Sequence, residues 1–135
     1  MKLNFRSLAI LSSVIFFALA LTWLLAPNFF LSRWGVEFSQ PVGLVGRRVA
    51  ALCLGIGIMF FSARDAAPSS ARSALVTGFV VACLTLAALG VFELATHHAS
   101  SGILSAVLVE VALAVAFLSV ARSGSASCES GAFRR

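Results

Sequence analysis

The sequence predicts an all-α fold, a four-helix transmembrane bundle with both termini in the cytoplasm. Of its 135 residues, 60% are apolar and only 11% are charged, whereas soluble domains average about 45–50% and about 25%. Four apolar stretches each approach the roughly 20 residues that a helix needs to cross a bilayer core of about 30 Å. This composition excludes a disordered protein, a coiled coil and an ordinary soluble globule. Residues 1–121 form one membrane domain, with spans at about 7–26, 41–63, 73–95 and 102–121.

The first span is the longest uncharged stretch. No charged residue lies between Arg6 and Arg33, and Pro27 ends the predicted helix. A signal peptide cleaved after Ala20 is the competing interpretation, and it would leave three spans. Because apolar sequence continues beyond Ala20 to Leu25, we favour a retained helix.

The second span contains two arginines. Arg48 and Arg64 enclose too few residues to cross a membrane, so the helix must begin near Pro41, which suits a first turn. Arg47 and Arg48 then lie inside the span. Small residues recur on one face, which favours close helix packing: Gly43, Gly46, Ala50, Cys53 and Gly57. Arg47 borders this face and Arg48 is nearly opposite it, so an interior face predicts a buried Arg47 and a snorkelling Arg48.

Short connections join the later spans. The segments 64–72 and 96–101 predict that spans two and three, and spans three and four, are antiparallel neighbours. Residues 122–135 are rich in serine and glycine and predict a disordered tail.

Basic residues predict the orientation. The N-terminus, the second loop and the tail hold seven, and the opposite side holds three, which places both termini in the cytoplasm: Lys2, Arg6, Arg64, Arg72, Arg122, Arg134 and Arg135 against Arg33, Arg47 and Arg48.

The first loop then faces outward, and its aromatic residues suit a membrane interface. A short helix there would be capped by Asn28 and ended by Gly35. Phe30, Trp34 and Phe38 are spaced by four, so a helical loop would lie flat on the membrane.

Four ionisable residues within the spans form the candidate site. Each costs about 2.5–3.5 kcal/mol near a helix centre, so such residues usually pair or face a cavity. Their charges cancel and all lie in the predicted outer half, which predicts a polar cluster linking spans two, three and four: Arg47, Arg48, Glu93 and Glu110. His97 and His98 are accessory candidates on the same side. The cluster is either a structural salt bridge or a proton or substrate site.

Other chemistry is not indicated. Basic residues are scattered along the chain, which argues against nucleic-acid binding. Cys53, Cys83 and Cys128 form no CxxC motif and predict free thiols. The adjacent histidines in the last loop make a poor chelating pair, so we expect neither a metal nor a cofactor. No catalytic motif is present, so we assign no catalytic residue.

Three stretches resemble small four-helix bacterial membrane proteins of unknown function, loosely grouped with DoxX-like proteins: residues 26–30, 46–57 and 62–72. The resemblance covers roughly residues 5–121 and implies a bundle in the bacterial inner membrane, with no established activity. Small multidrug exporters also have four short helices, but their essential glutamate lies in the first helix. Span one here has no acidic residue, so they are a poorer match.

Three functions are consistent with these observations. The first is a non-enzymatic component that packs with itself or with a membrane partner. The second is a proton-coupled transporter using Glu110 with Arg47 or Arg48. The third is a quinone- or redox-linked membrane component. The sequence lacks the CxxC motif and the paired intramembrane histidines that such a function would favour.

Overall fold

The computed structural model describes residues 4–132, with side chains up to residue 121. These residues form five α-helices and one short 3₁₀-helix, with no strand among them: α1 (Phe5–Leu25), α2 (Pro27–Trp34), α3 (Gln40–Ala63), α4 (Ser70–Ala95), η1 (Ser101–Ile103) and α5 (Leu104–Ala132). Four helical segments are long and apolar enough to cross a membrane: Phe5–Leu25, Gln40–Ala63, Ser70–Ala95 and Ser101–Ala121. The all-α four-span prediction is therefore confirmed.

The helices begin and end at residues suited to those positions. Ser39 and Ser69 precede α3 and α4, and each hydroxyl accepts a hydrogen bond from a backbone N–H three residues later. Pro27, not Asn28, opens α2, since its fixed φ suits a first turn. Gly35 ends α2 in the left-handed region (φ 76°), as predicted, so the helix does not continue to Phe38.

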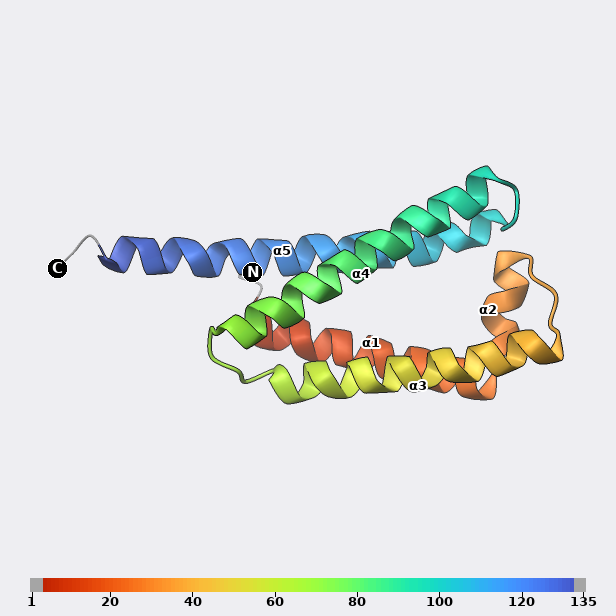
Figure 1. The fold of residues 1–135 in the computed structure, drawn as a ribbon, viewed down its shortest axis with the longest axis horizontal. Coiled ribbons are helices and arrows are strands. Elements are labelled where there is room, and N and C mark those ends of the chain that lie inside the picture. Colours follow the sequence, from red (N-terminus) through yellow and green to blue (C-terminus); the bar gives the residue numbers. More distant parts are fainter. Residues whose placement is uncertain (1–3, 133–135) are drawn as a thin grey trace.

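The spans pair as two hairpins, α1 with α3 and α4 with α5 (Figure 1). The small-residue face of α3 packs against α1, as an interior face should. Gly46 lies under Trp23 and Gly57 lies under Phe17, where an added Cβ would come within 2.9 and 2.7 Å of the rings. Gly90 of α4 packs against Val107 of α5 in the same way, because an added Cβ would lie 2.7 Å from the Val107 side chain. Small residues thus set the close approach within each hairpin.

The two hairpins meet at the end that carries Arg6, Arg64 and Arg72, here called the basic end. Phenylalanines from all four spans interlock there: Phe60 lies 4.6 Å from Phe79 and 5.2 Å from Phe117 between ring centroids, and Phe5 lies 6.3 Å from Phe117. The buried core includes all four of these rings. Aromatic packing at one end therefore joins the hairpins.

The opposite end, here called the α2 end, is joined differently. Figure 1 shows the hairpins further apart here, with α2 between them. Ser100, in the turn between α4 and η1, donates its N–H to the Trp34 carbonyl (2.8 Å) and its hydroxyl to the Arg33 carbonyl (2.5 Å). On the other side, Trp34 and Phe30 pack against Trp23 of α1 with tilted rings, whose centroids lie 5.8 and 5.4 Å from that of Trp23. Helix α2 is thus a bridge between the hairpins.

Two packing expectations need correction. Within the described residues, α3 and α4 contact each other near their connecting loop, through Phe60 and Phe79, and not along their lengths as antiparallel neighbours would. The reason is that the glycine face of α3 is turned to α1. Arg47 is exposed rather than buried, because a side chain at the edge of that face can still project outward.

The C-terminal segment also differs from expectation. The backbone of α5 continues as helix to Ala132, where the composition predicts a tail without regular structure. Residues 133–135 lie outside the described part of the chain, and so do Lys2 and the rest of residues 1–3.

Candidate functional site

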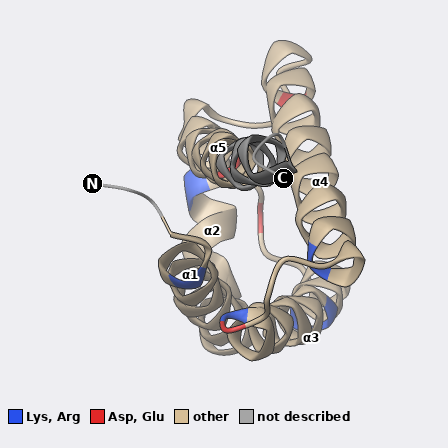
Figure 2. Cartoon of the chain, turned by 90° about the vertical axis from the view of Figure 1, so that its left-hand side faces the viewer, with Lys and Arg blue, Asp and Glu red and all other residues tan. Residues whose placement is uncertain are grey.

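The four intramembrane charges lie on different hairpins. Arg47 and Arg48 are exposed on α3, about 10–12 Å along the helix from Gln40 at 1.5 Å per residue. Glu110 is half-buried on α5 at a similar depth, about 12–14 Å from Ser101, and Glu93 is half-buried near the end of α4. Figure 2, viewed from the basic end, shows α1 and α3 at the bottom, α4 at the right and α5 at the top.

The structure does not bring the two arginines to the two glutamates. Among the side chains it describes, the ion pairs are Arg6–Asp65 and Arg64–Asp65, and His98 contacts Glu93. None of these contacts joins α3 to the carboxylates of α4 or α5. The arginines belong to the α1–α3 hairpin and the glutamates to the α4–α5 hairpin. The role of these four residues stays a prediction.

Two predicted residues do meet, at the C-terminal end of α4. Nδ1 of His98 lies 3.2 Å from the Glu93 carboxylate and 3.1 Å from Oγ1 of Thr96. His97 is exposed and has a positive φ of 60°, which turns the chain out of the helix. Because neighbouring histidines diverge, only His98 joins Glu93. Within the described residues no cluster of three metal-ligating side chains occurs.

Glu110 is half-buried, whereas the two cysteines of α3 and α4 are buried. Cys53 of α3 and Cys83 of α4 are free and buried, and Cys128 lies outside the described side chains. On α5, Glu110 lies on the same side of the helix as the buried Ala114 and Phe117, but it is itself only half-buried.

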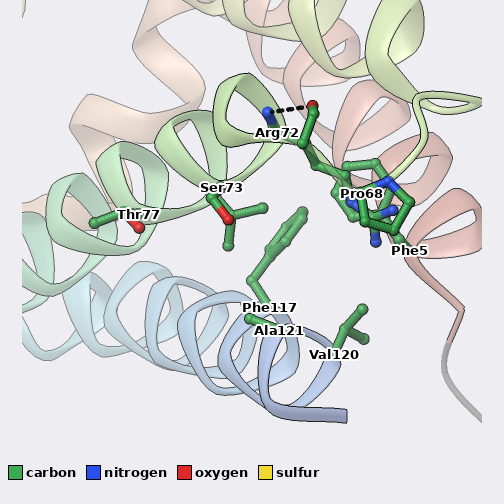
Figure 3. A pocket seen from close by; sticks show the side chains of 10 residues that line it. Phe5, Pro68, Arg72, Ser73, Thr77, Phe117, Val120 and Ala121 are labelled. Atoms are coloured by element: carbon green, nitrogen blue, oxygen red, sulfur yellow. Dashed lines mark hydrogen bonds between the residues drawn. The ribbon is translucent and has the colours of Figure 1, made fainter. Parts of the chain in front are cut away.

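A cavity of about 430 Å³ at the basic end was missed by the sequence reading (Figure 3). It lies between α1, α4 and α5, with Phe117 as part of its apolar wall, and Ser73 and Thr77 directed toward it. Arg72 also lines it. The sequence signal for this cavity is Arg72 followed by hydroxyl side chains one and five residues later. The apolar walls come from segments that are distant in sequence, so this pattern alone does not indicate a cavity.

The fold defines a multi-pass α-helical membrane protein. No protein-family model matches this chain, and no curated protein and no solved structure is significantly similar to it. The resemblance to DoxX-like proteins therefore stays a prediction.

Proposed function

We propose that this chain is a non-enzymatic packing component of a membrane assembly, in which the α2 end associates with a second copy of the chain. One observation carries the proposal. Arg47 and Arg48 are exposed on a membrane-spanning helix and have no carboxylate partner among the described side chains. A charge at such depth is costly unless it is paired or reaches water.

A second copy offers the missing carboxylates. Copies inserted in the same orientation hold their Glu110 side chains at a depth similar to that of Arg48 in a neighbour. Because the arginines are on one hairpin and the glutamates on the other, such pairing is heterologous, joining α3 of one copy to the α4–α5 hairpin of the next. This arrangement supports a closed ring in the membrane.

Charge exchange between copies tests this pairing. In liposomes, energy transfer between copies labelled at their N-termini reports association. We expect Arg48→Glu and Glu110→Arg each to weaken association at least tenfold, and a mixture of the two variants to recover it, since each then offers the other an opposite charge. Arg6→Gln is the control, because Arg6 lies at the basic end beside Asp65 (3.1 Å) and should leave association unchanged.

Native mass spectrometry of the same protein gives the assembly size. A monomeric wild type, or variants that do not complement, would mean that Arg48 snorkels to lipid phosphate instead. A pH-dependent flux that Glu110→Gln abolishes would replace this proposal with the transport function.

A further inference from the structure

We propose that the cavity at the basic end binds the phosphate group of an anionic lipid, held by Arg72 over an apolar base. The site is independent of the association proposed above, because its residues lie at the other end of the spans. It combines a fixed cation, side-chain hydroxyls and aromatic walls in one opening.

The cation is held in position. The Arg72 guanidinium carbon lies 3.7 Å from the centroid of the Phe5 ring, and Nη1 donates to the Ala66 carbonyl at 3.2 Å. A guanidinium has five N–H donors and matches phosphate with two parallel hydrogen bonds. Among the described side chains no carboxylate pairs with Arg72, whereas Arg6 and Arg64 both pair with Asp65. Of the three arginines described at this end, Arg72 is therefore the one that a phosphate can engage without displacing a carboxylate.

The depth of the cavity matches that of lipid phosphates. Arg72 is the third residue of α4, a membrane-spanning helix, so its side chain lies near the membrane surface. Further along α4, the cavity is lined by Ser73 and then Thr77, as Figure 3 shows. Hydroxyls beside the guanidinium can donate to the remaining phosphate oxygens or to a glycerol backbone.

Most of the remaining lining of the cavity is apolar. Phe117 and Val120 of α5 and Val76 of α4 line it together with the Phe5 ring. A volume of about 430 Å³ falls within the usual range for small-ligand sites, about 300–1,000 Å³. It accommodates a headgroup and the first methylenes of the acyl chains, which then continue into the surrounding bilayer. The chemistry recognised is thus a phosphate attached to an apolar chain.

The test measures lipid retention by the full-length protein. Native mass spectrometry after transfer from mixed vesicles of phosphatidylglycerol and phosphatidylcholine reports which lipid stays bound. We expect the wild type to retain phosphatidylglycerol selectively and Arg72→Gln to lose about tenfold in apparent affinity, the effect of one charge-assisted contact. The matched control is Arg64→Gln, whose guanidinium is at the same end but over Phe61 and beside Asp65; it should retain the lipid.

A second variant guards against a folding effect of Arg72→Gln. Ser73→Leu keeps the Arg72–Phe5 contact and fills part of the cavity, so it should also reduce retention. Competition with inorganic phosphate separates the two sources of the group: displacement at equal concentration identifies the free ion as the ligand, and no displacement identifies the lipid. Equal retention by wild type and Arg72→Gln, or an equal loss in Arg64→Gln, would overturn the proposal.

Discussion

The basic end and the α2 end of this molecule are held together in different ways. At the basic end, four phenylalanine rings from all four spans form a buried core, and Phe60 and Phe117 are 1% and 0% exposed. At the α2 end, a short helix links the hairpins through two hydrogen bonds from Ser100 and through aromatic packing against Trp23.

This difference separates stability from the candidate charges. The four phenylalanines of this core lie at the basic end, away from Arg47, Arg48 and Glu93 and about two helical turns from Glu110 along α5. The surfaces that carry these charges can therefore change their contacts without dismantling the fold. Regions with few buried contacts open at lower free-energy cost than the core. The α2 end is therefore where association with a neighbour can occur.

The largest expected effect comes from removing the core that joins the hairpins. Phe60→Ala should lower the free energy of unfolding by about 3 kcal/mol, the lower end for Phe→Ala, because lipid is as apolar as the core and only packing is lost. Denaturation of the detergent-solubilised protein, followed by circular dichroism, measures it. Phe92→Ala is the control, since Phe92 is 59% exposed on α4. Equal effects of the two variants would show that the core does not join the hairpins.

A smaller effect is expected within one hairpin. Gly57→Leu places a side chain where Phe17 lies, and overpacking of this kind costs about 1–3 kcal/mol. Gly55→Leu is a matched control two residues away, because nothing lies within 4 Å of its added Cβ. In the same denaturation assay, the free energy of unfolding should be about 2 kcal/mol lower for Gly57→Leu than for Gly55→Leu. No difference would mean that α1 and α3 do not depend on the glycine face for their contact.

The spans were predictable because length and hydropathy alone decide whether a helix can cross a bilayer. The interior face of α3 was also predictable, since glycines at Gly46 and Gly57 permit a close approach on one side only. Which helix would meet that face was not, because Phe17 and Trp23 of α1 are no better suited to it by composition than many apolar residues of α4.

The candidate site was less predictable for the same reason. Depth follows from counting residues, so Arg48 and Glu110 were placed at similar levels, but their lateral distance depends on the hairpin pairing. The cavity beside Arg72 depends on Phe5 and Phe117, which are far apart in sequence and meet only in the folded chain.

The smallest effect tests whether the α2 end opens separately from the basic end. Gly102 is packed against the Arg33 carbonyl, and an added Cβ would collide with that oxygen, so Gly102→Ala must displace backbone. We expect the free energy of local opening at the α2 end to fall by about 1 kcal/mol, which is the value of the Ser100 hydrogen bonds that this contact supports. Hydrogen exchange of the Ser100 amide, which donates to Trp34 at 2.8 Å, should then be roughly five- to tenfold faster, with exchange around Phe79 unchanged. Gly78→Ala, with open space around its added Cβ, should alter neither rate. Faster exchange at both ends in Gly102→Ala would show instead that the bridge and the phenylalanine core unfold as one unit, and the α2 end would then not be free to rearrange around a neighbouring copy.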